Sequence, residues 1–190
     1  MLNNILLQIA KSAILSKFDG GDCIDRELLL EKYPFLNKKG AVFVTLNYDN
    51  QLRGCIGSIT PYRTLLDDVL HNAVSAAFGD PRFTPLSSRE LANLTLEVSV
   101  LSEPTILEYK DYDDLMKKVR PFVDGLILKH GSYQGTFLPQ VWEQLPLTEQ
   151  FLEHLSMKAG ANPSIYALHP TIYRYEVEHI KDNFKNIKGV

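Results

Sequence analysis

The sequence lacks the features that mark several large classes of protein. Its 190 residues include only two cysteines, Cys23 and Cys55, and neither belongs to a Cys-x-x-Cys pair or a Cys/His cluster. Two isolated cysteines exclude a disulfide scaffold and give no sign of a zinc site. No stretch reaches the roughly 18 consecutive apolar residues that a membrane-spanning helix needs. We therefore expect no membrane partner.

An excess of charge of either sign is also missing. Twenty Lys and Arg oppose 23 Asp and Glu, which leaves a net charge of -3. Such a chain has no overall field that attracts nucleic acid, so nucleic acid is not an expected partner. Neither a Gly-x-Gly-x-x-Gly sequence nor a P-loop is present, and the acids at 111–114 lack the spacing of a calcium loop. No metal site is predicted, and the cofactor, if the protein uses one, stays unknown.

The composition is that of a globular protein. Apolar residues make up 45% of the chain and charged residues 23%. A chain of this length buries roughly 70% of its unfolded surface and needs no disulfide to be stable. The apolar positions of residues 1–18 are interrupted by Asn3, Asn4 and Gln8, unlike the core of a signal peptide. We expect a protein of the reducing cytoplasm.

The first half of the chain predicts helices around a hairpin and a further strand. Apolar residues recur with helical spacing in the helices, and alternate with polar residues in the last strand. On the helix at 66–77, Asp68 and Asn72 fall on the face opposite the apolar stripe, where we expect solvent. The predicted elements are helices at 2–17, ended by Gly20-Gly21, at 25–33 and at 66–77, strands at 41–46, 52–59 and 94–100, and a short helix opened by a capping box at 87–90.

The second half repeats that order. A helix at 111–119 is followed by a hairpin with strands at 126–129 and 135–138, a helix at 148–159 and a strand at 171–177. Hairpin, helix and strand thus occur twice. The pattern predicts an α+β fold in which a mainly antiparallel sheet is flanked by helices and a hairpin-helix-strand unit is duplicated. Residues 1–190 are expected to form one domain with two lobes, about 1–102 and 103–190, that share one sheet.

The segment Leu52-Arg53-Gly54-Cys55-Ile56-Gly57-Ser58 is unusual for a strand. Two glycines inside a strand lower its stability and often mark a bulge or a close approach of another group. Simple alternation places Arg53, Cys55 and Gly57 on one face of the strand, and Gly54 and Ile56 on the other.

Two interpretations of Cys55 fit this pattern. A guanidinium two residues away on the same face favours the thiolate form, so Arg53 and Cys55 are candidate catalytic residues. Free cysteine is also among the most buried residue types, and the glycines then serve only close packing. A catalytic cysteine needs a base, and the sequence marks no histidine as its partner.

Two loops add candidate binding residues. In Asp80-Pro81-Arg82-Phe83 the planar guanidinium of Arg82 is suited to a carboxylate or phosphate, and Asp80 and Arg82 are equally suited to stabilising the loop itself. After the predicted strand at 135–138, Gln140 presents an amide either to a ligand or, as we favour, to backbone groups of its own loop.

These motifs resemble the AMMECR domain family. The segment LRGCIGS is similar to the family's signature, and further segments agree in order between about residues 41 and 177. They are Ala76-Ala77, Asp80-Pro81-Arg82-Phe83, Pro85-Leu86, Leu96–Leu101, Asp124-Gly125-Leu126, Gly135, Leu138-Pro139-Gln140-Val141 and Lys158-Ala159-Gly160. Gln134 and Phe122 depart from the family pattern, where a basic residue and glycine are common.

The resemblance implies an α+β fold with a duplicated unit and leaves the activity open. Prokaryotic members resemble the A component of the AmmeMemoRadiSam system, which implies a Memo-type protein and a radical S-adenosylmethionine enzyme as partners. We expect a binding or adaptor component in which strand 52–58 forms a groove for a partner or a small-molecule ligand. The predicted groove residues are Gly54, Ile56, Gly57, Ser58, Asp80, Arg82 and Gln140. The alternative is an enzyme or enzyme component that uses Cys55 as a thiolate activated by Arg53.

Overall fold

The computed structural model describes residues 4–19 and 24–190. The chain divides into two compact units, unit 1 (Met1–Leu101 with Glu178–Val190) and unit 2 (Ser102–Val177). Both combine helices with antiparallel sheet, which confirms the predicted α+β class. The expected helix end at Gly20-Gly21, and Cys23, lie outside the described residues.

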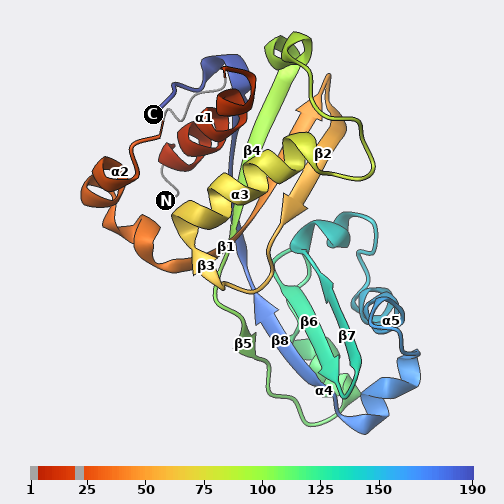
Figure 1. Ribbon diagram of the computed structural model, residues 1–190. Helices are drawn as coiled ribbons and strands as arrows, with labels where there is room; N and C mark the ends of the chain where they lie inside the picture. The colour runs from red at the N-terminus through yellow and green to blue at the C-terminus, as the bar shows by residue number, and fades with distance from the viewer. Residues whose placement is uncertain (1–3, 20–23) are drawn as a thin grey trace. The chain divides into compact units, whose positions relative to one another are not determined.

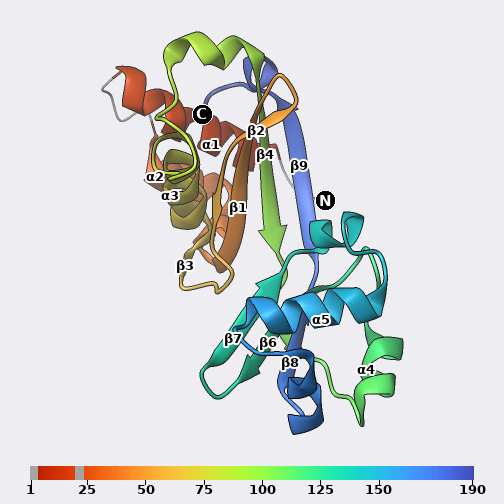
Figure 2. The same cartoon turned by 90° about the vertical axis from the view of Figure 1, so that its right-hand side faces the viewer.

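Unit 1 is a sheet with helices packed against it. The strands lie in the order β2-β1-β4-β9, with the short β3 paired to β1. Helices α1 and α3 lie side by side over one face of this sheet (Figure 1), and Figure 2 shows α1, α2 and α3 on the same side of it. The elements are α1 (Ile5–Asp19), α2 (Arg26–Lys32), β1 (Lys39–Tyr48), β2 (Gln51–Gly57), β3 (Arg63–Thr64), α3 (Leu65–Phe78), β4 (Leu94–Leu101) and β9 (Val177–Asn183), with 3₁₀ turns η1 (Pro34–Asn37), η2 (Ser88–Asn93) and η5 (Phe184–Asn186).

The hairpin of β1 and β2 follows from its sequence. Asp49 and Asn50 form the two-residue turn with φ of 48° and 64°, a left-handed conformation that Asp and Asn tolerate better than most residues. Along β1, Val42, Val44 and Leu46 are buried and belong to one core with α1 and α3. The alternation of the strand therefore leaves Phe43 and Thr45 on the opposite face.

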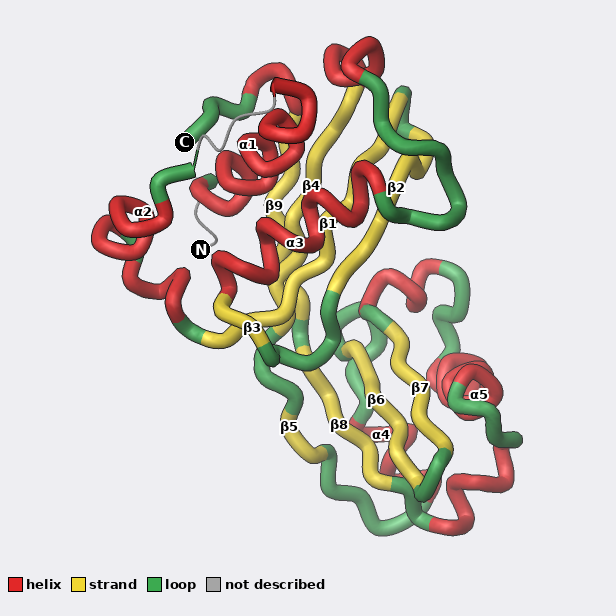
Figure 3. The backbone as a smooth tube through the Cα atoms, viewed as in Figure 1, coloured by secondary structure: helices red, strands yellow, loops and turns green. Residues whose placement is uncertain are grey.

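Unit 2 has its own sheet and core. Its strands lie in the order β5-β8-β6-β7 (Figure 3). Leu126 and Leu128 of β6 share a buried cluster with Leu115 of α4 and Phe151 of α5, so both helices pack on the same sheet face. The elements are β5 (Thr105–Ile106), α4 (Tyr112–Lys118), β6 (Gly125–His130), β7 (Tyr133–Phe137), α5 (Thr148–Lys158) and β8 (Thr171–Tyr175), with 3₁₀ turns η3 (Pro139–Glu143) and η4 (Pro163–Leu168).

The duplicated order that the sequence predicts is confirmed. In each unit the strand after the helix pairs with the first strand of the hairpin, giving β2-β1-β4 and β7-β6-β8. The strands nevertheless form two sheets, where the pattern predicts one shared sheet. Residues 178–190 belong to unit 1 and not to the second lobe, because Lys11 of α1 donates hydrogen bonds to the carbonyls of Phe184 and Ile187. The predicted last strand at 171–177 ends at Tyr175, and the sequence reading missed β9.

Candidate functional site

Strand β2, which carries the glycine-rich motif, is an edge strand of the unit 1 sheet. Its register with β1 changes near the turn, because Leu46 pairs with Gly54 while Asn47 pairs with Leu52. Arg53 is therefore the additional residue of a β-bulge. A bulge interrupts simple alternation, so the assumption that placed Arg53 and Cys55 on one face does not hold.

The free edge of β2 is closed at Cys55 by two side chains from the loop after α3. The backbone N–H of Cys55 donates to Asp80 Oδ2 at 2.9 Å, and Arg82 Nη2 donates to the carbonyl oxygen of Cys55 at 3.1 Å. The N–H and the carbonyl of Cys55 point away from β1. The side chains of Asp80 and Arg82 bind them, as the backbone of a neighbouring strand would do. Edge strands that are covered in this way resist unwanted pairing.

Asp80 and Arg82 also form an ion pair with each other. Arg82 donates through Nε to Asp80 Oδ1 at 2.9 Å and through Nη2 to Oδ2 at 2.7 Å. These hydrogen bonds are the main reason why the pKa of Asp80 lies far below its usual range, and the N–H of Cys55 lowers it further against the opposing effect of burial. Asp80 is buried, whereas the Arg82 side chain is 53% exposed. We call the pair of Asp80 and Arg82, bound to both backbone groups of Cys55, the clamp. It holds the half-exposed guanidinium of Arg82 in a fixed position beside Cys55.

Arg53 has a partner other than Cys55. Its guanidinium donates to both carboxylate oxygens of Glu90, at 2.6 and 3.3 Å, and its side chain is only 13% exposed. The Arg53 hydrogen bond is the largest cause of a lowered pKa at Glu90. The Phe83 ring lies 5.8 Å from the guanidinium of Arg53 and 5.5 Å from that of Arg82. Arg53 therefore joins β2 to η2 and to the loop of Asp80.

The thiol of Cys55 is partly buried and has one polar neighbour from β1. The hydroxyl of Thr45 donates to Cys55 Sγ at 3.3 Å, and the two residues are directly opposite in the hairpin. Among residues 4–19 and 24–190, no histidine or carboxylate is hydrogen-bonded to this sulfur. The arrangement around Sγ does not supply the general base that nucleophilic catalysis requires.

Packing explains both glycines of the motif. A β-carbon at Gly54 would overlap the carbonyl oxygen of Ala76 on α3, and one at Gly57 would overlap the ring of Phe43. Gly54 thus lets α3 lie directly on the edge strand, a role for which no other residue is small enough. The glycines are needed to seat a helix and an aromatic ring rather than to expose the sulfur.

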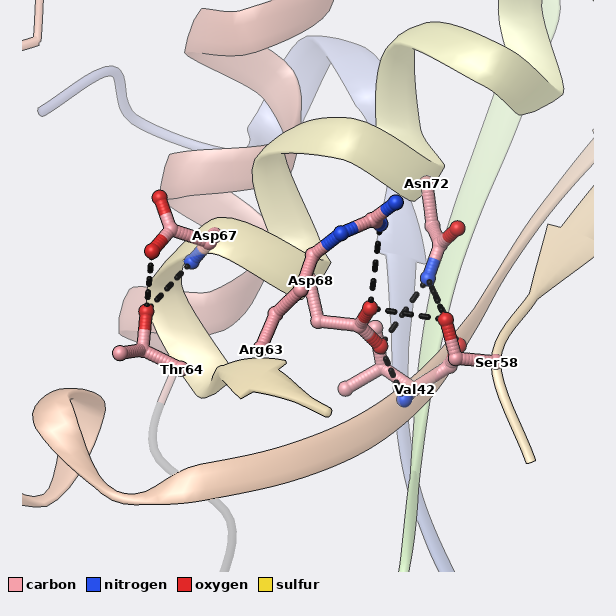
Figure 4. A network of polar contacts seen from close by, with 7 residues as sticks. All are labelled: Val42, Ser58, Arg63, Thr64, Asp67, Asp68 and Asn72. Atoms are coloured by element: carbon pink, nitrogen blue, oxygen red, sulfur yellow. Dashed lines mark hydrogen bonds and ion pairs between the residues drawn. The ribbon is translucent and has the colours of Figure 1, made fainter. Parts of the chain in front are cut away.

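Ser58, just after β2, belongs to a buried polar network (Figure 4). Its hydroxyl donates to Asp68 at 2.8 Å, and Asp68 also accepts from the N–H of Val42 at 2.9 Å and from Asn72 at 3.1 Å. Arg63 lies 3.4 Å from the same carboxylate. The expectation that Asp68 and Asn72 face solvent is wrong: both are buried, at 0% and 2% exposure. A satisfied network can be buried, and this one fixes the start of α3 against β1.

The remaining predicted groove residues, Ile56 and Gln140, belong to different units. Ile56 is half-buried and packs on the core of unit 1. Gln140 is an exposed residue of η3 in unit 2. Its participation in a groove with β2 stays a prediction. The loop and η2 side chains that hydrogen-bond to residues of β2 include those of Asp80, Arg82 and Glu90.

The sequence reading missed Thr45, Asp68, Asn72 and Glu90. Only Glu90 carried a local signal, because it closes the predicted capping box with Ser87, which the structure confirms. Thr45 reaches Cys55 through strand register, and Asp68 reaches Ser58 through the packing of α3 on β1. Neither relation is visible in local periodicity.

Residues 4–19 and 24–190 contain neither a membrane-spanning helix nor a group of metal-ligating side chains. None of their helices combines the length and apolar character of a membrane span. They also contain no group of three or more His, Cys, Asp or Glu side chains placed to hold a metal ion.

The chain is similar to known proteins both in sequence and in structure. The model of the AMMECR1 family matches residues 7–180. Protein MJ0810 of Methanocaldococcus jannaschii is 35% identical over 162 residues, covering 80% of this chain and 79% of that protein. A protein of Methanothermobacter thermautotrophicus is 41% identical over 150 residues, 76% of each chain.

The chain is also similar to a solved structure, the crystal structure of the uncharacterized protein PH0010 from Pyrococcus horikoshii. It has a TM-score of 0.81 and 32% sequence identity, and the match covers 98% of this chain and 93% of that one. None of these names states an activity, so the function has to be argued from the site.

Proposed function

The chain belongs to the AMMECR1 family, and we propose that it works as a binding component, with β2 and the loop of residues 79–87 as the surface that holds a protein partner or a small ligand. The observation that carries this proposal is the clamp of Asp80 and Arg82 on both backbone groups of Cys55. A strand held by side chains on its free edge is a rigid surface, and rigid surfaces lose little entropy on binding.

The exposed side chains of this surface, one cationic and one apolar, suit a partner that offers an acidic and an apolar group. Arg82 is half-exposed and already oriented by Asp80, and Leu52 at the start of the motif is 44% exposed. An oriented guanidinium binds a carboxylate with little further loss of freedom. Leu52 adds an exposed apolar side chain on the same strand as Cys55, whose carbonyl Arg82 binds.

The partners that we propose are a Memo-type protein and a radical S-adenosylmethionine enzyme. Their support is the resemblance to the A component of the AmmeMemoRadiSam system. We also place the protein in the cytoplasm, where a free thiol such as Cys55 stays reduced.

Binding can be measured by calorimetry with the Memo-type protein and the radical enzyme encoded in the same genome. We expect Leu52→Glu to weaken binding at least about tenfold, because a second carboxylate beside the partner's acid is repelled. Leu168→Glu is the matched control, since Leu168 is a 62% exposed leucine of unit 2. Equal binding by wild type and Leu52→Glu would refute this surface.

The second candidate function is thiol chemistry at Cys55. The observation that favours it is the Thr45 hydroxyl, which donates a hydrogen bond to Sγ at 3.3 Å. Alkylation by iodoacetamide at pH 6, in a Cys23→Ser background, separates the two functions. A binding role predicts that folding slows the alkylation of Cys55. Faster alkylation in the folded protein than in urea would instead favour the enzyme.

A further inference from the structure

Unit 2 contains a cavity of about 410 Å³ that is remote in sequence from the motif of β2. It lies between the start of α4, the first turns of α5, and η4 with the residue that follows it. This volume is within the range of small-molecule sites, about 300 to 1,000 Å³. The cavity combines aromatic rings with acidic side chains.

The aromatic part of the cavity is held in place. The rings of Tyr112 and Tyr166 have centroids 5.2 Å apart, and the buried Tyr166 hydroxyl donates to the carbonyl of Leu152 at 2.6 Å. The His169 ring stacks on Tyr109 with centroids 4.3 Å apart, and His169 Nε2 lies 3.0 Å from the Tyr109 carbonyl oxygen. The rings of Tyr112, Tyr166 and His169, which line the cavity, are therefore held in fixed positions.

The acidic part comes from α5. Glu149 and Glu153 are one helical turn apart and both line the cavity. Within the described part of the chain, neither carboxylate takes part in an ion pair. Burial is the larger cause of the raised pKa of Tyr112, and the charges of Glu149 and Glu153 add to it. The two carboxylates thus act on the space next to the Tyr112 ring.

Lys110 is the cationic residue in the lining, and its backbone N–H donates to Asp114, an acid outside the lining. Lys110 and Lys118 both lower the pKa of Asp114, with the Lys118 hydrogen bond as the largest cause. Asp111 also lines the cavity, and one of its carboxylate oxygens caps α4 by accepting from the N–H of Asp114. The lining therefore carries three carboxylates against one ammonium, and its field favours a cation.

We propose that this cavity binds a primary alkylammonium group. The ammonium lies between Glu149 and Glu153, since its three N–H groups can donate to both carboxylates. The alkyl chain lies against Tyr112 and Tyr166, where the ring faces attract the adjacent charge. The same chemistry occurs in free aliphatic diamines and in the lysine side chain of a protein.

An NMR titration tests this with n-butylammonium, and with 1-butanol as the neutral probe of nearly the same shape. We expect the amine to shift backbone signals of residues 110–112, 149–153 and 163–169, and the alcohol to shift none of them. Butane-1,4-diamine and Nα-acetyl-lysine methylamide then separate the two sources of the amine. Equal shifts with butanol, or with Mg²⁺ at the same ionic strength, would overturn the proposal.

Variants of Glu149, Glu153 and Tyr112 test whether these carboxylates and this ring bind the amine. The double variant E149Q/E153Q should weaken amine binding about tenfold, and Tyr112→Leu about threefold, while Tyr112→Phe keeps the ring and the affinity. Glu143→Gln is the matched control, an exposed acid of η3 outside the cavity. If E149Q/E153Q binds butylammonium as tightly as Glu143→Gln, the proposal is wrong. None of these residues belongs to the surface of β2, so this result is independent of the proposed function.

Discussion

Units 1 and 2 share a strand order but differ in their polar chemistry. In each unit the second strand of the hairpin is an edge strand, β2 or β7, on which the following helix lies. A β-carbon at Gly54 would meet the backbone of α3, and one at Gly135 would lie 2.7 Å from the backbone nitrogen of Ala159, just after α5. The glycine is thus a requirement of this packing in both units.

The residue after the glycine shows where the two units diverge. Cys55 follows Gly54, and its backbone is held by Asp80 and Arg82. Thr136 follows Gly135, and its hydroxyl donates to the carbonyl of Leu126. The repeated topology therefore reflects how a helix packs on an edge strand in both units. The binding of the strand's backbone by an Asp and an Arg side chain is a property of β2 in unit 1. This is the physical reason for assigning the proposed binding surface to β2.

Among the described residues each unit has one acid at 0% exposure, Asp68 in unit 1 and Asp124 in unit 2, and the largest predicted effect concerns these two residues. Asp68 accepts from Ser58 and Val42, and Asp124 accepts two hydrogen bonds from the guanidinium of Arg120. Asp68→Ala and Asp124→Ala should each lower the free energy of unfolding by about 3 to 5 kcal/mol, because the surrounding donors and cations lose a buried carboxylate that pairs with them.

The single tryptophan tells the two units apart in this experiment. Trp142 is buried in unit 2 and its indole N–H donates to the carbonyl of Asp124. We expect Asp124→Ala to lower the urea concentration at the midpoint of unfolding measured by Trp142 fluorescence. Asp68→Ala should chiefly lower the midpoint measured by circular dichroism. The exposed Glu103→Ala is the control. Identical shifts of both probes in both variants would mean that the units unfold as one.

The next effect compares the two glycines. Gly54→Val should destabilise by about 3 kcal/mol, and Gly135→Val by less, because the overlap with α3 is the more severe. Gly189→Val is a matched control, since its β-carbon would lie at an ordinary contact distance of 3.5 Å from the nearest atom. Urea unfolding measures all three. A larger loss at Gly135 would contradict the comparison.

A smaller effect concerns the clamp and depends on pH. Asp80→Asn removes the charge that pairs with Arg82 and should cost about 1 to 3 kcal/mol at neutral pH. Since the folded pKa of Asp80 is lowered, its contribution is fully present above the unfolded value of about 3.9 and is lost as pH falls through the folded value. The difference between wild type and variant should therefore be constant above about pH 5 and shrink below about pH 4. A difference that grows in acid would refute this assignment.

The smallest effect is expected at the thiol itself. Cys55→Ser keeps a small polar group opposite Thr45 and should change the free energy of unfolding by less than about 1 kcal/mol. Binding of the partner should persist. The corresponding change in unit 2, Thr136→Val, removes a hydrogen bond to Leu126 and should cost about 1 kcal/mol. Loss of partner binding in a stable Cys55→Ser protein would support thiol chemistry.

Much of the fold was predictable because its signals are local. The capping box of Ser87 and Glu90 appears where the sequence indicates it, and α4 and α5 begin and end within one residue of the helices predicted at 111–119 and 148–159. Strand β9 was missed because its residues after Val177 are mostly polar and exposed, so no clear alternation marks it.

The candidate site was only partly predictable. The motif at 52–58 and the pair Asp80 and Arg82 could be singled out, since their residue types are unusual in a strand and a loop. The partner of Arg53 could not, because Glu90 lies 37 positions away and meets it only through the fold.

The sequence by itself determined the elements, their duplicated order and the residues that merit attention, because apolar periodicity, capping and turn chemistry act over a few residues. Only the tertiary structure decided that Arg53 pairs with Glu90, that Cys55 is held by Asp80 and Arg82, and that Asp68 is buried. Charges and hydrogen bonds act between groups that are close in space, and the register of β2 and the packing of α3 bring these groups together.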